Sequence, residues 1–342
     1  MSRTTAGADQ ASPALVTARE ATLFSAMNHK QVFGHVMGEL AEKSDDLAVV
    51  VSDYGRRLSL DELRAARPDA YVQCGIAEQN QIEVASALAN EGFRAFAPCY
   101  ATFITSRVLD QVRVNLGMMR SPVALVGVSC GCEAAMLGAS HMSLEDLAIM
   151  RTIPNLEVIA PADTVELASV LRDLAARPRP AYVRANELDG ACLHTAGASY
   201  EPGVAQHLFV PAGVAAEVAI VATGTICSRA VDAARILGER GVATEVLEFA
   251  SVKPLDSGAL EALCAAGIRL VVTLEEHSYL GGLGGAVAEC LAGRVQGPDA
   301  PTPRLLRLGM PDDYLEADAH HAVLERAGLD ADAIARTVAE SL

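Results

Sequence analysis

Glu78 stands at a point in the sequence where a carboxylate could act on a bound ligand. It lies in the hexapeptide Gly-Ile-Ala-Glu-Gln-Asn at 75–80, directly after an extended run at 70–74. Apolar residues beyond it repeat with a helical period, so Glu78 is expected to open a helix at the end of a strand. This arrangement holds an acid at the mouth of an α/β sheet, where it can serve general acid–base chemistry. The alternative is that Glu78 only stabilises the helix N-terminus through the macrodipole.

Five later side chains could complete a binding site around such an acid. Tyr100 and Phe103 enclose Ala-Thr at a predicted turn from strand to helix. Arg107 and Asp110 would lie one helical turn apart and could be no more than an ion pair. His141 follows Gly-Ala-Ser, and it suits proton transfer because both of its protonation states are accessible near pH 7. It could also be an ordinary loop residue.

Taken together and in this order, these motifs resemble the thiamine-diphosphate enzymes of the transketolase family. The matching segments are Gly-Ile-Ala-Glu-Gln-Asn, Tyr-Ala-Thr-Phe, Asp-Gln-Val-Arg at 110–113 and Gly-Ala-Ser-His at 138–141. The resemblance covers the pyrimidine-binding and C-terminal domains of these enzymes, from about Met27 onward. It implies that thiamine diphosphate supplies the reactive carbon, while the protein binds and activates this cofactor.

The resemblance also assigns roles to four of these residues. Glu78 matches the glutamate that bonds to N1′ of the cofactor's aminopyrimidine ring and shares a proton with it, in surroundings expected to be mostly apolar. Phe103 matches the aromatic ring that stacks on the aminopyrimidine, with Tyr100 nearby, although Tyr100 could instead be a core residue. His141 matches the histidine that contacts the hydroxyl and carbonyl oxygens of the donor. Glu78 and His141 are therefore the expected catalytic residues.

Five further residues are expected to contact the cofactor or the substrate. Asp53, at the end of a predicted strand, and Arg107 are placed near the cofactor. Arg184 falls where the family has a phosphate-binding arginine, which suits bidentate binding of an anion; the other interpretation is a structural salt bridge. Ser129 stands where the family has a histidine that binds sugar phosphate. Lys30 stands where the family has an arginine.

Three positions depart from the family pattern on the substrate side of the site. Leu137 replaces the acid that recognises a sugar hydroxyl, and Ser129 and Lys30 replace a histidine and an arginine. These changes make the expected pocket less polar and less cationic. They predict a specialised ketol transfer with at least one unusual substrate, such as a non-phosphorylated and more apolar one.

Strand-like and helical segments alternate along the whole chain, which indicates an α/β fold with mostly parallel sheets covered on both faces. We expect two doubly wound domains: a pyrimidine-binding domain at 21–186 and a transketolase C-terminal-like domain at 214–342. A flexible tail at 1–20 and a linker at 187–213 complete the chain. Within the first domain, the segment 101–116 is predicted as one helix, and a helix from 143 is predicted to be capped by Ser143.

The glycine-rich stretch 281–285 allows two interpretations. It reads Gly-Gly-Leu-Gly-Gly after a strand ending in Glu-Glu-His, so it could cradle a phosphate at a helix N-terminus. It matches neither of the common phosphate-binding motifs. Close packing is the favoured interpretation.

Composition excludes several classes of partner. The net charge of -16 argues against nucleic acid and anionic membranes as partners, and no apolar run is long enough to span a bilayer. Residues 1–20 lack the apolar core of a secretory signal. The eight cysteines are scattered and are expected to be free thiols, so we expect a cytoplasmic protein.

The metal-binding motif of the family does not occur in this sequence. The family holds Mg²⁺ and the diphosphate with Gly-Asp-Gly in an N-terminal domain, and the chain contains no Gly-Asp-Gly. The resemblance therefore implies a partner subunit that carries this motif, in an α₂β₂ assembly. No metal ligands are predicted in this chain.

The sequence thus predicts the C-terminal subunit of a heteromeric transketolase, active only with its partner. It would move a two-carbon ketol unit from a ketose or ketose phosphate to a carbonyl acceptor. Two alternatives stay open: the β subunit of a 2-oxo acid dehydrogenase, which has the same domain pair, and a non-catalytic scaffold subunit.

Overall fold

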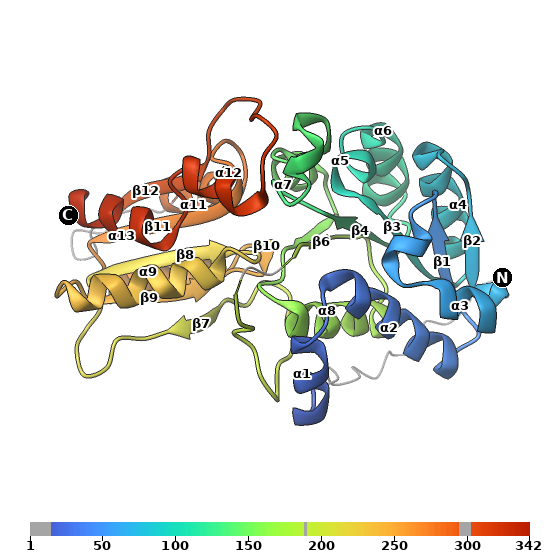
Figure 1. Cartoon of the computed structure of the whole chain (residues 1–342), viewed down its shortest axis with the longest axis horizontal. Coiled ribbons are helices and arrows are strands. Elements are labelled where there is room, and N and C mark those ends of the chain that lie inside the picture. Colours follow the sequence, from blue (N-terminus) through green and yellow to red (C-terminus); the bar gives the residue numbers. More distant parts are fainter. Residues whose placement is uncertain (1–14, 188–189, 294–301) are drawn as a thin grey trace.

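The structure is a computed structural model, and it describes residues 15–187, 190–293 and 302–342. Two separate sheets organise these residues, one with seven strands and one with five. They lie beside each other in Figure 1, with the five-stranded sheet at the left. Within the described residues, no helix has the length and apolarity needed to cross a membrane.

The seven-stranded sheet has the order β10-β5-β6-β4-β3-β1-β2. Every neighbouring pair is parallel except β10 with β5. Strands β1, β4, β5 and β6 are buried along their whole length, because a parallel sheet is covered on both faces. The strands are β1 Leu47–Val51, β2 Tyr71–Gln73, β3 Arg94–Tyr100, β4 Val123–Val128, β5 Glu157–Ile159, β6 Ala181–Ala185 and β10 Ser251–Lys253.

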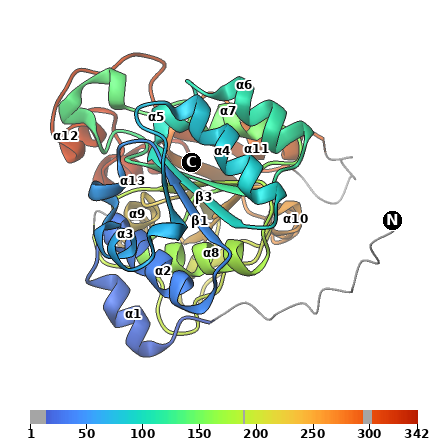
Figure 2. The same cartoon turned by 90° about the vertical axis from the view of Figure 1, so that its right-hand side faces the viewer.

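Helices cover both faces of this sheet, as Figure 2 shows with α4 and α6 above the strands and α2 and α8 below. Two hydrophobic clusters, one on each face, bury these helices against the strands. The lower face carries α1 Ala18–Ser25, α2 His29–Lys43, α3 Asp61–Ala66 and α8 Thr164–Ala176. The upper face carries α4 Glu78–Asn90, α5 Ala101–Ile104, α6 Leu109–Val112 and α7 Asp146–Thr152.

The five-stranded sheet has the order β12-β11-β8-β9-β7, with only β7 antiparallel to its neighbour. Its two faces are again covered by separate apolar clusters. The strands are β7 Gln206–Phe209, β8 Val218–Thr223, β9 Thr244–Glu248, β11 Leu270–Ser278 and β12 Arg304–Met310. The helices are α9 Cys227–Glu239, α12 His320–Arg326 and α13 Ala331–Glu340 on one face, and α10 Ser257–Ala265 and α11 Leu283–Ala292 on the other.

The predicted fold class is confirmed: two α/β units, each built on a mostly parallel sheet. The predicted helix at 101–116 is wrong in one respect, because α5 ends at Ile104 and α6 begins only at Leu109. The Thr105 hydroxyl donates to the Ala101 carbonyl at 2.7 Å, a local bond that competes with the helical backbone pattern.

Ser143 does not cap a helix, contrary to the prediction. It pairs with Gly131 through two backbone hydrogen bonds of 3.0 and 2.8 Å, and α7 starts three residues later at Asp146. A local capping pattern was overridden here by pairing with a distant loop.

The described residues begin within the predicted tail. Val16 is buried, and Thr17 and Glu20 form a capping box that starts α1 at Ala18. The rest of the predicted tail, 1–14, lies outside the described residues.

The two units are joined by more than a linker. Strand β10 follows β9 of the second sheet but pairs with β5 of the first. Within the predicted linker, Tyr200 is buried and its hydroxyl donates to Glu157 at 2.5 Å, at the start of β5. The predicted domain boundaries stay a prediction.

Candidate active site

The predicted site residues gather at the carboxyl edge of the first sheet. Four adjacent strands, β4-β3-β1-β2, end there, and the residues that follow them are brought together although they are far apart in sequence. These residues are Asp53 after β1, Glu78 after β2, Tyr100 at the end of β3, Phe103 after β3, and Ser129 and His141 after β4; Tyr54, which was not predicted, lies next to Asp53.

Glu78 is the first residue of α4 and is only 4% exposed. Its Oε2 accepts a hydrogen bond from Arg107 Nη1 at 2.9 Å. The Cys99 thiol lies 3.9 Å from the other carboxylate oxygen, and burial, aided by the charge of Glu78, raises the pKa of this thiol to about 12. The surroundings of Glu78 are therefore less apolar than predicted, because an arginine reaches the carboxylate.

Arg107 does not pair with Asp110, whose nearest cation is Arg113 at 3.8 Å. The interruption between α5 and α6 places Arg107 on the turn that faces Glu78. Its guanidinium carbon lies 4.0 Å from the centre of the Phe103 ring, which is a cation–π contact. Arg107 thus joins the carboxylate and the aromatic ring that the sequence singled out.

Three rings form a cluster beside this pair. Tyr100, Phe103 and His141 meet edge to face, with centroids 5.4 to 5.8 Å apart. The ring centroids of Tyr54 and Tyr100 lie 4.5 Å apart. Burial, and secondly the interaction with Tyr100, raise the pKa of Tyr54 above its usual range. Arg57 donates to the Tyr100 hydroxyl at 3.2 Å. His141 therefore packs against the rings of both Tyr100 and Phe103.

Ser129 and Lys30 meet at Glu133, a residue that the sequence did not suggest. The Ser129 hydroxyl donates to the Glu133 carboxylate at 2.9 Å and Lys30 Nζ does so at 3.0 Å. His29 is buried 3.6 Å from the same carboxylate. Burial lowers the pKa of His29 to about 4, so this imidazole is neutral at pH 7. The charge of Lys30 is balanced within the chain.

Arg184 is buried, and its guanidinium is engaged within the protein. It donates to Asp146 at 2.9 Å and to the Glu276 carbonyl at 2.7 Å. This geometry fits a structural salt bridge, the second of the two interpretations of Arg184. Asp53, by contrast, is exposed at the end of β1.

Several apolar side chains are exposed around the same edge. Ile76, two residues before Glu78, is 75% exposed. Met136 and Leu137, which precede His141, are 70% and 54% exposed. Large exposed apolar side chains clustered at one edge are typical of a surface that another protein covers.

A pocket of about 490 Å³ lies next to the His141 loop, between the two units. Ala139, Met142 and Glu145 line it from the first unit, and Leu280 and the segment 311–315 line it from the second. Its lining is mainly apolar with a few carboxylates.

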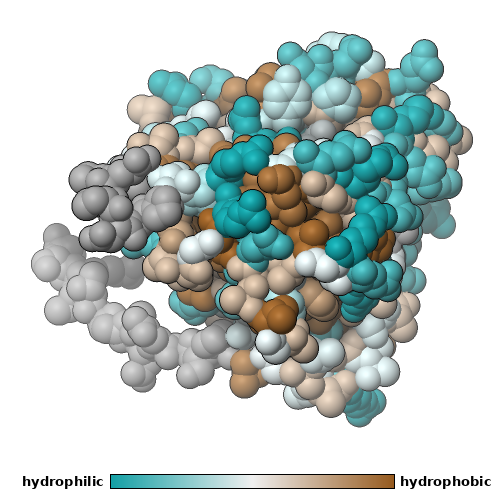
Figure 3. Space-filling view, turned by 90° about the vertical axis from the view of Figure 1, so that its left-hand side faces the viewer, coloured by the Kyte–Doolittle hydropathy of each residue, from teal (hydrophilic) through white to brown (hydrophobic). Residues whose placement is uncertain are grey.

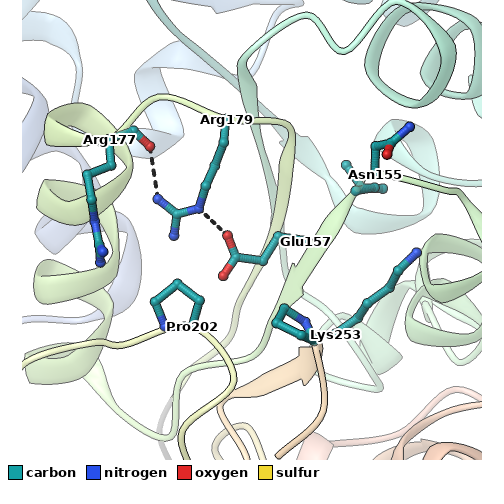
Figure 4. Close-up of a pocket in the computed structure, with 8 residues that line it drawn as sticks. Asn155, Glu157, Arg177, Arg179, Pro202 and Lys253 are labelled. Atoms are coloured by element: carbon teal, nitrogen blue, oxygen red, sulfur yellow. Dashed lines mark hydrogen bonds and ion pairs between the residues drawn. The ribbon is translucent and has the colours of Figure 1, made fainter. Parts of the chain in front are cut away.

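A second pocket, of about 430 Å³, lies at the opposite, amino end of β5 (Figure 4). Arg179 points at Glu157 and also donates to the Arg177 carbonyl at 2.9 Å. Arg177 pairs with Asp173. Both arginines of this pocket are therefore paired with carboxylates of the chain itself.

The glycine stretch at 281–285 fits the packing interpretation. The Glu275 carboxylate accepts the backbone N–H groups of Leu283 and Gly284 at 2.7 and 2.8 Å, so it occupies the start of α11. A Cβ at Gly282 would lie 2.0 Å from the same carboxylate. The Glu275 carboxylate thus occupies the helix N-terminus at which a phosphate could have bound.

The chain matches two known domains in the expected order. Residues 25–190 match the transketolase pyrimidine-binding domain, and residues 213–334 match the transketolase C-terminal domain. The chain belongs to the transketolase family, whose members depend on thiamine diphosphate, and it corresponds to the C-terminal part of these enzymes.

Two relatives of similar length are named as subunits. One subunit of the apulose-4-phosphate transketolase of Phocaeicola vulgatus is 30% identical, over 91% of this chain and 96% of the relative. The 6-deoxy-6-sulfo-D-fructose transketolase subunit of a Clostridium species is 33% identical, over 88% of this chain and 90% of the relative.

Among solved structures, a protein described as a split gene transketolase, inactive β4 tetramer, superposes with a TM-score of 0.81. It is 30% identical, over 92% of this chain and 98% of the other. The transketolase of Campylobacter jejuni shares the fold, with a TM-score of 0.71 at 16% identity, and this chain covers 47% of it.

Proposed function

We propose that this chain is the C-terminal subunit of a two-component transketolase. It moves a two-carbon ketol unit from a ketose donor to a carbonyl acceptor with thiamine diphosphate. The convergence of Glu78, Phe103 and His141 at one sheet edge carries the proposal. The names of the two similar-length relatives, both subunits of transketolases, support it.

The contacts of Arg107 test whether an aminopyrimidine ring fits the site. The guanidinium is flat, carries N–H donors, stacks on Phe103 and bonds to Glu78. An aminopyrimidine ring is also flat and bears nitrogens at its edge. The place between Phe103 and Glu78 therefore accepts a group of this shape and chemistry, and the residues fit the cofactor.

When bound, thiamine diphosphate supplies the carbon that attacks the donor carbonyl. Glu78 holds a proton at the N1′ position of the cofactor, and Phe103 orients the ring from its face. The Ser140 hydroxyl lies 3.0 Å from His141 Nδ1, which leaves Nε2 free to move a proton at a substrate oxygen. The hydrogen-bond partners of His141 thus suit a proton-transfer role.

The substrate side of the site supports a substrate with little negative charge. Lys30 is balanced by Glu133, which also binds Ser129, and Leu137 adds an exposed apolar side chain. Arg184 is engaged by Asp146. We therefore propose that at least one substrate is non-phosphorylated and more apolar than a sugar phosphate.

The partner is proposed to be an N-terminal subunit with a Gly-Asp-Gly motif that holds Mg²⁺ and the diphosphate. The exposed Ile76, two residues before Glu78, and the exposed Met136 and Leu137, which precede His141, suit such a contact. The description of the similar split gene β4 tetramer as inactive agrees with a need for a second chain. We propose an α₂β₂ assembly.

The decisive experiment is reconstitution. The chain is co-purified with its partner and assayed with thiamine diphosphate, Mg²⁺ and a panel of ketose donors. Ketol transfer is expected only with both chains, and Glu78→Gln is expected to lower kcat by about 100-fold or more. Glu91→Gln, at the exposed end of the same helix, is the matched control. Decarboxylation of 2-oxo acids without ketose turnover, or full activity of the Glu78 variant, contradicts the proposal.

A further inference from the structure

A second group of ionisable side chains lies away from Glu78, where the two units of the chain meet. Glu166 belongs to the first turn of α8, His194 to the connection between β6 and β7, and Glu248 is the last residue of β9. One ligand atom from each lies within 4.8 Å of the other two. The three residues therefore come from the first unit, the connecting segment and the second unit.

Asp163 fixes the orientation of the His194 ring. Its Oδ2 accepts the backbone N–H groups of Leu193 and His194, both at 2.8 Å, and lies 3.0 Å from His194 Nδ1. An ionised carboxylate only accepts, so Nδ1 carries the hydrogen and Nε2 faces Glu248. A carboxylate behind the distal nitrogen is the usual outer partner of a metal-binding histidine.

The group has few hydrogen-bond donors, and Gln206 Nε2 reaches Glu166 Oε1 only at 3.4 Å. Glu166 Oε2 and Glu248 Oε1 share one donor, the backbone N–H of Ala162, at 2.8 and 3.0 Å. Glu248 Oε2 and His194 Nε2 are buried without a hydrogen-bond partner among the described residues, although only 3.2 Å separates them. Buried polar atoms of native proteins are normally satisfied, so a cation in this position would remove the deficit.

We propose that Glu166, His194 and Glu248 bind one divalent transition-metal ion, for which Zn²⁺ is the best chemical match. One imidazole nitrogen and two carboxylate oxygens suit this borderline ion, and four-coordinate Zn²⁺ spaces its ligand atoms by about 3.4 Å. The separation of 3.2 Å between His194 Nε2 and Glu248 Oε2 agrees with that spacing. This ion is separate from the Mg²⁺ of the cofactor.

The ion is bound by residues of both units and of the segment between them. It therefore joins the two units through one bonded centre, which stabilises the folded chain.

A second cluster, Cys132, Glu276 and His320, has comparable spacing but a different hydrogen-bond balance. Glu276 there accepts from the Cys132 backbone at 2.8 Å, lies 3.0 Å from His320 Nε2, and receives a weaker bond from Asn186. The carboxylate is already satisfied. We therefore assign the metal to the His194 cluster and use the second cluster as a control.

The test measures metal content and thermal stability of the full chain, purified without a metal-chelating tag. The chain is unfolded, refolded with Zn²⁺, Mn²⁺ or EDTA, passed over a gel-filtration column and analysed for metal. We expect about one Zn²⁺ per chain, and a lower thermal midpoint after refolding in EDTA. A wild-type chain that holds no metal under any of these conditions overturns the proposal.

Matched variants locate the ion. His194→Gln and Glu248→Gln are expected to reduce the bound metal at least tenfold. His207→Gln removes an exposed imidazole, which lies on β7 with its Nδ1 3.5 Å from the Glu245 carboxylate on β9. This variant and His320→Gln are both expected to retain the bound metal. Equal metal in all variants, or loss only in His320→Gln, overturns the assignment. Refolding the wild type with Co²⁺ gives an independent check, since a thiolate-to-cobalt absorption band that is lost in His320→Gln would place the ion at Cys132 instead.

Discussion

At the scale of single residues, Arg107 occupies the proposed cofactor-binding position in the isolated chain. Its guanidinium stacks on Phe103 and pairs with Glu78, so it occupies the position proposed for the aminopyrimidine ring. Cofactor binding must therefore exchange one partner of Glu78 for another. The Arg107 side chain is 46% exposed, so it can move into solvent without disturbing the core.

We expect Arg107→Met to tighten thiamine diphosphate binding by roughly fivefold. A partly exposed ion pair is worth about 1 kcal/mol, and its loss removes a competitor for Glu78. Cofactor titration of the reconstituted complex measures this, with Arg113→Met as the control on the neighbouring turn. Weaker binding would show instead that Arg107 holds the cofactor directly.

The lowered pKa of His29 predicts that the free energy of unfolding depends on pH. Burial lowers its pKa to about 4 from 6.5, so below pH 6.5 the unfolded chain takes up a proton that the folded chain does not bind until about pH 4. The folded state therefore loses stability as the pH falls through this window, by about 2 kcal/mol at pH 5. Urea unfolding at pH 7.5 and 5.0 measures it. His29→Gln should reduce this dependence of the unfolding free energy on pH, and His35→Gln, on the same helix, serves as the control. The same loss of stability between pH 7.5 and 5.0 in the wild type and in His29→Gln would refute the prediction.

At the scale of elements, helix caps hold segments together beyond their own helix. Asp163 caps α8 and also accepts two N–H groups from the connection at 193–194. Asp256 caps α10 through Ala259 and accepts the Ala205 N–H at 2.8 Å. A single carboxylate thus positions both a helix and a connecting segment.

This double role can be measured on Asp256. Asp256→Ala is expected to cost about 2 kcal/mol, because it removes a cap and leaves the Ala205 N–H without its partner. Asp330 caps α13 through Ala333 alone, so Asp330→Ala is expected to cost about 1 kcal/mol. Chemical denaturation of both variants gives the comparison. Equal losses would mean that the bond to Ala205 contributes nothing.

At the scale of the whole molecule, two of the places where apolar side chains are exposed lie far apart. One is the carboxyl edge of the first sheet, where Ile76 precedes Glu78 by two residues. The other is at the far end of the second unit, where the loop after β7 carries Val210 and Val214, each 60% exposed. Figure 3 shows this end, where apolar side chains gather near the centre of the view and hydrophilic ones border them above and to the right.

We expect the edge near Glu78 to be the partner-binding surface. Ile76→Glu should weaken association with the N-terminal subunit at least tenfold, because it introduces a charge where an apolar side chain is buried on binding. Val214→Glu, at the far end, should leave association unchanged. Native mass spectrometry or analytical ultracentrifugation of the mixed chains measures both. The reverse pattern would move the interface to the second unit.

The sequence by itself determined the alternation of strands and helices, because buried strands and amphipathic helices have short-range apolar periods. It also determined the family, and it singled out Glu78, Phe103 and His141 through motifs that each span a few residues. The order of strands then brought these motifs to one edge. The fold class could thus be predicted, whereas the roles of the three site residues stay a prediction.

Only the tertiary structure decided which side chains meet. The pairing of Arg107 with Glu78, the balancing of Lys30 by Glu133, and the return of β10 to the first sheet join positions from 29 to more than a hundred residues apart along the chain. The cluster of Glu166, His194 and Glu248 spans both units and the segment between them. No local pattern encodes such contacts, because they depend on the sheet order and on how two separately folded units pack.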